Sequence, residues 1–195
     1  MMKIDMMKIP RLLIVYVLII WPIIMFFLFM IITGKVCVSY EGFAVDNEFN
    51  LYLGKDYAIE VLNEKGEVLR KISPFTSRGY KFTVTTDNTI IISTGEYLYT
   101  TDLLGNLIDK KTISDYTDDK LNNINRHEFT TSNGTVYIMK NFLLRTHIYR
   151  LEGSQKVTVY KMPIFDYIVK LSAVMCFISL IIVVPICLVK WKRDR

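Results

Sequence analysis

Few residues of this 195-residue chain have the types and spacing that catalysis or metal binding requires. The two histidines, His127 and His147, form no H-x-x-H pair, and no C-x-x-C motif occurs, so we expect no metal site from this chain alone. The sequence also lacks a G-x-S-x-G elbow, an S-x-x-K motif and a phosphate-binding glycine loop. We therefore predict no catalytic residue, no cofactor and no enzymatic activity.

The acidic residues leave one enzymatic alternative open. Asp115, Asp118 and Asp119 lie in a polar stretch, residues 115–126, but lack the glycine and the terminal glutamate of a calcium loop. We interpret this stretch as a solvated loop. Carboxylates from separate turns could still meet in space and form the site of an envelope hydrolase, which a cleft with two carboxylates about 5–9 Å apart would reveal.

Two long uncharged apolar runs bracket the chain. They cover residues 12–33 and 171–189, which are 22 and 19 residues long. A bilayer core of roughly 30 Å needs about 20 apolar residues in a helix, so both runs are long enough to cross it. We predict two transmembrane helices, at residues 12–33 and at 163–189, the second with an outer extension that begins near Pro163. They flank a domain at residues 34–162.

The charges predict the orientation of these helices. The whole formal charge of +5 lies in the basic flanks at residues 1–11 and 190–195, while the middle of the chain is neutral. Short basic flanks stay cytoplasmic, so we expect a cell-membrane protein with both termini cytoplasmic and the central domain outside. The expected partner is then the lipid bilayer, and nucleic acid is not an expected partner.

The second apolar run carries a stripe of small or slim side chains at helical spacing. Its members are Ser172, Cys176, Ser179, Val183 and Cys187. Small residues let helices approach closely in lipid. We expect this stripe to pack on the first helix, or alternatively on the helix of a membrane-protein partner.

The middle of the chain has the pattern of an all-β domain. Short alternating runs rich in Val, Ile, Tyr, Phe and Thr are separated by turns that contain Gly, Asn or Asp, as in successive antiparallel hairpins. Gly66, Gly105 and Gly153 recur at intervals of 39 and 48 residues. Asn133 and Gly134 predict a two-residue hairpin turn in which both residues have positive φ.

These runs resemble blades of the NHL-type β-propellers. A strand that ends at a turn (44–46), a hydrophobic-Tyr-hydrophobic strand (51–53), a third strand (59–62) and a glycine turn with an outer strand (66–72) make up the first copy. The resemblance implies three repeats of antiparallel meanders, at about 42–73, 80–112 and 126–162. Propellers typically need four or more blades to close. An open, β-sandwich-like arrangement is therefore the alternative.

The resemblance implies a binding or scaffold role, because the functions of the family vary widely. We expect a non-enzymatic binding or interaction module, or alternatively an accessory subunit of a membrane complex. Three open-edged blades could pair with three from a second copy and close a six-bladed ring as a homodimer. The alternative is a monomer whose edges are protected by lysines such as Lys71, Lys110 and Lys111.

Overall fold

The computed structural model describes residues 16–37, 39–76, 79–113 and 127–193. The chain divides into two compact units, one formed by residues 1–38 with 164–195 and the other by residues 39–163. The basic flank at residues 1–11 and the polar stretch at 115–126 lie outside the described residues. The side chains of the basic tail at 190–195 also lie outside them.

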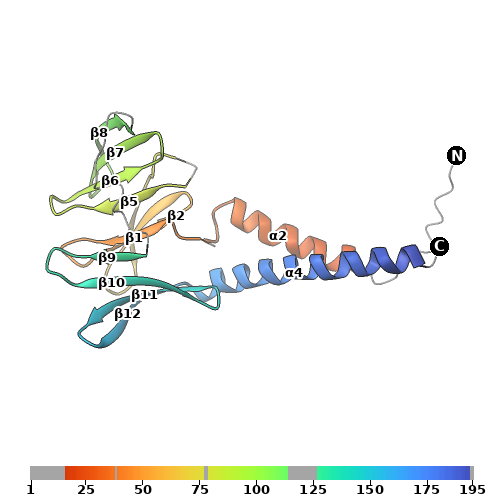
Figure 1. Ribbon diagram of the computed structural model, residues 1–195. Coiled ribbons are helices and arrows are strands. Elements are labelled where there is room, and N and C mark those ends of the chain that lie inside the picture. Colours follow the sequence, from red (N-terminus) through yellow and green to blue (C-terminus); the bar gives the residue numbers. More distant parts are fainter. Residues whose placement is uncertain (1–15, 38, 77–78, 114–126, 194–195) are drawn as a thin grey trace. The chain divides into compact units, whose positions relative to one another are not determined.

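The first unit is helical. A π-helical turn η2 (Tyr16–Ile20) leads into α2 (Trp21–Ile32), and Pro22 stands in the first turn of α2, where its missing N–H leaves no hydrogen bond unmade. The second helix, α4 (Ile164–Arg193), is continuous past Pro185 (Figure 1). Helices α2 and α4 contact each other within this unit.

The structure contradicts the predicted membrane spans. Helix α2 has 12 residues, about 18 Å at 1.5 Å per residue, against a hydrocarbon core of roughly 30 Å. Helix α4 is long, but many side chains of its apolar run lie outside the described set. Among the described residues no helix is both long and apolar enough to cross a membrane. The two-pass topology, and with it the predicted cell-membrane localisation, are therefore wrong.

The second unit contains three four-stranded antiparallel meanders. Sheet A comprises β1 (Gly42–Val45), β2 (Leu51–Lys55), β3 (Ala58–Leu62) and β4 (Val68–Ile72). Sheet B comprises β5 (Lys81–Val84), β6 (Thr89–Ser93), β7 (Tyr97–Asp102) and β8 (Leu107–Thr112). Sheet C comprises β9 (Glu128–Thr130), β10 (Val136–Phe142), β11 (Arg145–Glu152) and β12 (Gln155–Lys161). The antiparallel, all-β part of the prediction matches these sheets, and each expected repeat range contains one of them.

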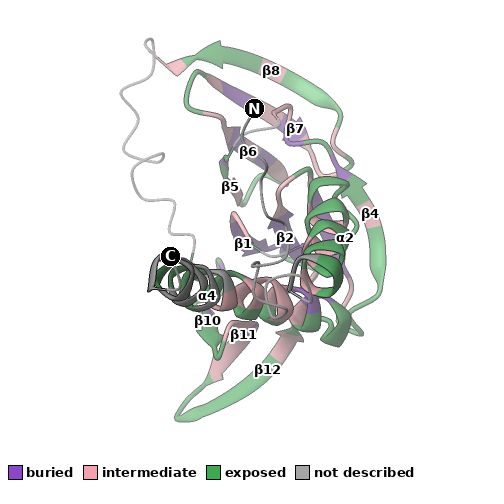
Figure 2. Cartoon of the chain, turned by 90° about the vertical axis from the view of Figure 1, so that its right-hand side faces the viewer, coloured by how far each residue is buried: buried purple, intermediate pink, exposed green. Residues whose placement is uncertain are grey.

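Sheet A lies at the centre of the packing in this unit. One core cluster joins Tyr52, Ile59 and Val61 of sheet A to residues of sheet B such as Ile90 and Ile92. A second cluster joins the other face of sheet A to sheet C and includes Phe43, Leu53, Met139 and Ile148. Alternation along β1, β2 and β3 sends successive side chains to opposite faces of sheet A, which supplies both clusters. Strand β1 contacts both β5 and β9, whereas the outer strands β4, β8 and β12 are largely exposed (Figure 2).

Five hairpin turns in this unit share one geometry. In each turn the N–H of the first residue donates to the carbonyl of the fifth, and the N–H of the fourth donates to the carbonyl of the first, at 2.9 to 3.2 Å. The fourth residue has positive φ, as in a three-residue hairpin loop that ends in a left-handed residue. The turns span residues 46–50, 63–67, 85–89, 102–106 and 131–135.

This geometry corrects the expected turn at Asn133 and Gly134. Gly134 has φ +83°, but Asn133 does not have positive φ, so the loop contains three residues instead of two. The hydroxyl of Thr131 accepts a hydrogen bond from the N–H of Thr135 and donates one to the side-chain oxygen of Asn133. These two bonds stabilise the longer loop. A turn with two positive φ values does occur, at Leu143 and Leu144 between β10 and β11.

Candidate functional site

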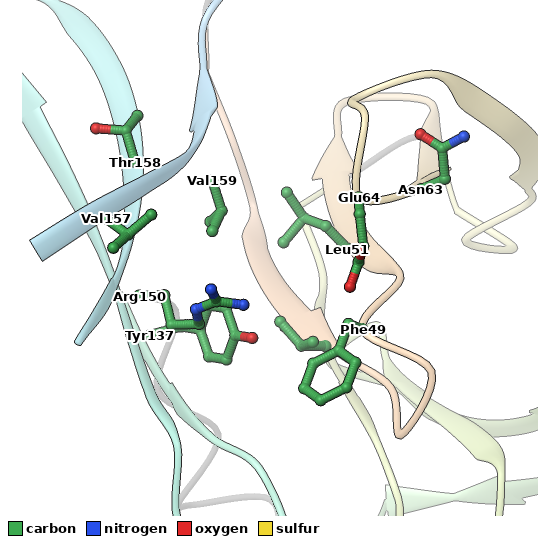
Figure 3. Close-up of a pocket in the computed structure, with 10 residues that line it drawn as sticks. Phe49, Leu51, Asn63, Glu64, Tyr137, Arg150, Val157, Thr158 and Val159 are labelled. Atoms are coloured by element: carbon green, nitrogen blue, oxygen red, sulfur yellow. The ribbon is translucent and has the colours of Figure 1, made fainter. Parts of the chain in front are cut away.

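A pocket of about 300 Å³ lies between sheets A and C. Figure 3 shows Arg150 and Val159 on one side of it, with Phe49, Leu51 and Glu64 on the opposite side. The pocket is lined by Val45, Phe49, Leu51, Asn63, Glu64, Tyr137, Arg150, Val157, Thr158 and Val159. Six of the ten lining residues are Val, Leu, Phe or Tyr, and the other four are polar or charged, so the pocket offers both apolar contacts and hydrogen bonds.

The turns of sheet A position one wall of the pocket. Leu51 pairs with Val45 and Leu62 across neighbouring strands, so these residues share one face of the sheet. The side-chain oxygen of Asn63 accepts hydrogen bonds from the N–H groups of Lys65 and Glu67, at 3.0 and 2.9 Å, and so stabilises the turn at 63–67. Glu64, the next residue, therefore occupies the first loop position at the rim of the pocket.

Arg150 supplies the main polar group of the opposite wall. Its Nη2 atom lies 2.5 Å from a carboxylate oxygen of Glu152. Burial lowers the pKa of Arg150, but hydrogen bonds to Glu152 and Tyr137 outweigh this effect and raise the pKa overall. Arg150 therefore stays charged, and its salt bridge to Glu152 compensates that charge locally.

The Nε atom of Arg150 is buried without a hydrogen-bond partner. In the described part of the chain three buried side-chain atoms share this condition: Arg70 Nε, Thr101 Oγ1 and Arg150 Nε. Of these three residues, Arg150 lines the pocket. A buried donor without an acceptor costs about 1–3 kcal/mol, and because this Nε atom is shielded from solvent it is not open to the pocket.

Phe49 occupies a turn position that disfavours its residue type. It is the fourth residue of the turn at 46–50, where the other four turns have Gly66, Asn88, Gly105 and Gly134. Its φ is +62°, and a residue with a Cβ atom in this region costs about 1–2 kcal/mol relative to the right-handed region. The residue remains 39% exposed at the pocket, so burial in the core does not explain its presence.

The charges around the pocket do not resemble those of a hydrolase. Glu64 is the sole carboxylate among the ten lining residues, so the pocket lacks the second carboxylate that the alternative requires. Across the described residues no group of three or more His, Cys, Asp or Glu side chains is arranged to hold a metal ion. The lining can contact apolar groups of a ligand and form hydrogen bonds with its polar groups.

Asp46 and Tyr52 are two further buried ionisable residues, and both are hydrogen-bonded. Asp46 accepts hydrogen bonds from the N–H groups of Glu48 and Asn50 and from the hydroxyl of Tyr52. Burial, followed by the nearby charge and hydrogen bond of Asp46, raises the pKa of Tyr52 to about 12. These groups hold the first hairpin of sheet A, whose loop carries Phe49.

Glu60 forms a second buried network in sheet A. Its carboxylate pairs with the ammonium groups of Lys55 and Lys71, the latter at 3.0 Å. Burial raises the pKa of Glu60, but hydrogen bonds and charges from the two lysines lower it more strongly, so the net shift is downward. The carboxylate is therefore held in its charged form.

The predicted repeat-turn residues do not line this pocket. Gly66, Gly105, Gly134 and Gly153 all have positive φ and lie in turns, with Asn133 beside Gly134. Gly105 approaches sheet A so closely that a Cβ atom would lie 2.9 Å from Cγ2 of Ile72. These residues shape the hairpins, and Gly66, Gly105 and Gly134 occupy the same turn position as Phe49.

The predicted helix stripe belongs to α4. Ser172, Cys176 and Ser179 are half-buried, and the hydroxyl of Ser179 donates to the carbonyl of Cys176 at 2.7 Å. Val183 and Cys187 belong to the same helix, with side chains outside the described set. That the stripe faces α2 stays a prediction.

The two histidines and Cys37 are not among the residues that line the pocket. His147 is stacked on Tyr149, with ring centroids 5.9 Å apart, and Cys37 is buried. His127 is exposed. Asp115, Asp118 and Asp119 lie outside the described residues.

Sequence reasoning missed Phe49 and Arg150. Aligning the turns by their first residues would have placed Phe49 in the column that otherwise holds Gly or Asn. That mismatch is a signal readable from the sequence once the turn geometry is known. Arg150 left no such signal, because its partners Tyr137 and Glu152 become meaningful only when the strand register is known.

No family model matches the chain, and no curated protein matches its sequence. Part of the chain is similar to the crystal structure of a protein of unknown function from Bacteroides caccae, with 8% sequence identity and a TM-score of 0.32. The match covers 63% of this chain and 60% of that chain, so the chain spans less than two thirds of that protein. A likeness of this extent assigns no family and no function. The resemblance to NHL-type blades rests on the pattern of strands and turns.

Proposed function

We propose that the unit formed by residues 39–163 is a non-enzymatic binding module and that the pocket between sheets A and C is its binding site. The observation that carries the proposal is the pocket itself, whose lining combines apolar side chains with two charged residues, Arg150 and Glu64, on opposite walls. The single lining carboxylate, Glu64, favours binding over hydrolysis, since hydrolysis of a glycosidic bond needs a carboxylate pair.

The test uses the full-length chain with labelled methyl groups and a set of small neutral amides that carry branched alkyl groups. We expect such amides to shift the methyl resonances of Val157 and Val159, which line the pocket, while those of Val68 on the exposed strand β4 stay unchanged. If no amide in the set moves the pocket resonances at millimolar concentration, the pocket is not a binding site and the proposal fails.

Self-association is a second candidate role. Sheet A packs on both faces, but the two core clusters of the described residues leave sheets B and C each packed on one face. A two-fold related copy could cover both open faces and form a closed symmetric dimer. Light scattering of the purified protein tests this role, because a single-chain mass at micromolar concentration would rule the dimer out.

A further inference from the structure

We propose that the pocket and the outer edge of β12 together bind an extended, neutral-to-acidic peptide, which adds to sheet C as a fifth strand and places one apolar side chain in the pocket. This proposal rests on the proposed function and specifies its ligand. Strand addition to a sheet edge combines main-chain hydrogen bonds, which supply affinity, with side-chain pockets, which supply specificity.

The edge of β12 lies directly beside the pocket. In the described part of the chain β12 pairs with β11 alone, so the other side of its segment 157–159 presents backbone N–H and C=O groups without strand partners. Val157, Thr158 and Val159 of this strand line the pocket (Figure 3). A peptide paired with this segment would therefore have alternate side chains at the mouth of the pocket.

The polar groups of the pocket match those of a peptide backbone. Arg150 lines the pocket, and N–H groups of its guanidinium can donate to a peptide carbonyl. Glu64 offers carboxylate oxygens on the opposite wall, which can accept a peptide N–H. The volume of about 300 Å³ lies at the lower limit of ordinary ligand pockets and suits an amino-acid side chain better than a large cofactor.

Two lysines of β12 favour an added peptide strand that carries negative charge. Lys156 and Lys161 are exposed and stand near the two ends of β12. They repel a second copy of the same strand and attract acidic residues at the ends of a peptide. A foreign peptide with acidic ends therefore fits this edge better than a second copy of this chain.

Phe49 is retained at its unfavourable turn position because its ring extends the apolar wall that the peptide side chain contacts. Glycine at this position would relieve the positive φ but remove the ring. The proposal therefore predicts that stability and affinity change in opposite directions at this residue.

The first experiment measures peptide binding to the full-length chain by calorimetry. The probe is an acetylated and amidated peptide of alternating threonine and leucine with glutamate at both ends. Two isomers are compared, one N-methylated on the leucines and the other on the threonines. Only alternate N–H groups of an added strand face β12, so we expect the isomers to differ at least tenfold in affinity. Equal affinity of the two isomers, whatever its value, overturns strand addition.

The second experiment compares matched turn variants. We expect Phe49→Gly to raise the melting temperature by several degrees and to weaken binding of the unmethylated peptide at least fivefold. Asn88→Gly is the control, because Asn88 holds the same turn position with φ +58° but does not line the pocket. It should leave the affinity unchanged. A Phe49→Gly variant with unchanged affinity overturns the role of the ring.

Arg150→Lys tests the hydrogen-bond donor with little change in charge. The lysine can still pair with Glu152 but lacks the planar, forked set of N–H donors of a guanidinium, so we expect at least a fivefold loss of affinity. If the small amides bind the pocket and the peptide does not, strand addition fails while the binding module stands. If neither binds, both proposals fail.

Discussion

The hydroxyl of Tyr52 donates a hydrogen bond to the carboxylate of Asp46, 3.1 Å away, in a part of sheet A that excludes solvent. Both residues belong to the first hairpin, whose loop also places Phe49 at the pocket. A phenol that is fully buried beside a carboxylate resists ionisation, and this resistance can be measured.

We predict that one tyrosine titrates with a pKa of about 12 and that this titration is missing in Tyr52→Phe. Because the folded pKa exceeds the model value of 10.0, the contribution of Tyr52 is fully present below pH 10 and is lost as the pH rises toward 12. The loss amounts to about 2–3 kcal/mol. Ultraviolet titration and denaturation at several pH values measure both effects, and an equal alkaline slope in wild type and variant would contradict the assignment.

Glu60→Gln should destabilise the protein by roughly 1–3 kcal/mol at neutral pH, because it removes a charged acceptor from Lys55 and Lys71. The pKa of Glu60 is lowered in the folded state, so its contribution is present above the unfolded value of 4.5 and is lost as the pH falls through the folded pKa. The variant should therefore lose less stability in acid. Asp109→Asn, which breaks the exposed pair with Lys111, is the control and should have little effect in denaturant titrations.

Gly105→Ala should cost more than Gly66→Ala, although both glycines hold the fourth position of the same kind of turn. A Cβ atom at residue 66 meets nothing within 4 Å, so the cost there is conformational, about 1 kcal/mol. At residue 105 the Cβ atom would lie 2.9 Å from Cγ2 of Ile72, which adds a steric cost. Equal midpoints of chemical denaturation for the two variants would refute the close approach of this turn to β4.

Replacing Leu143 and Leu144 with asparagine and glycine should stabilise the protein by about 1–2 kcal/mol. The two leucines have φ values of +46° and +71°, and Asn-Gly is the favoured pair for a two-residue turn of this kind. Leu143 is 72% exposed and Leu144 is half-buried, so the relief of two unfavourable φ values should outweigh the packing that is lost. A lower melting temperature in the double variant would show that the leucines make stabilising contacts.

The strands could be predicted from sequence because alternation and turn residues are local signals. Runs such as residues 89–93 and 97–101 fall within β6 and β7. The turn at Asn133 and Gly134 was placed correctly but given the wrong length, because the hydroxyl of Thr131 competes with the shorter loop. The Leu143–Leu144 turn was missed, since neither residue favours positive φ and the surrounding strands impose it.

The long apolar runs misled the prediction because hydropathy counts residues and does not show where a helix begins or ends. Within the run at residues 12–33, the described residues form an α-helix of 12 residues preceded by a π-helical turn. The pocket could not be predicted because its walls come from different sheets. Arg150 and Phe49 are about a hundred positions apart in the chain, and their proximity depends on how sheet C packs on sheet A.

Each strand of the three sheets pairs only with its neighbours in the sequence. Hairpins of this kind close through short loops at small entropic cost, so each sheet can form from local contacts as the chain leaves the ribosome. The contacts between distant segments converge on sheet A, which is synthesised first and joins both core clusters. Sheet A thus serves as the template on which the later sheets dock, and substitutions in it should slow folding more than equally destabilising substitutions at the outer faces of sheets B and C.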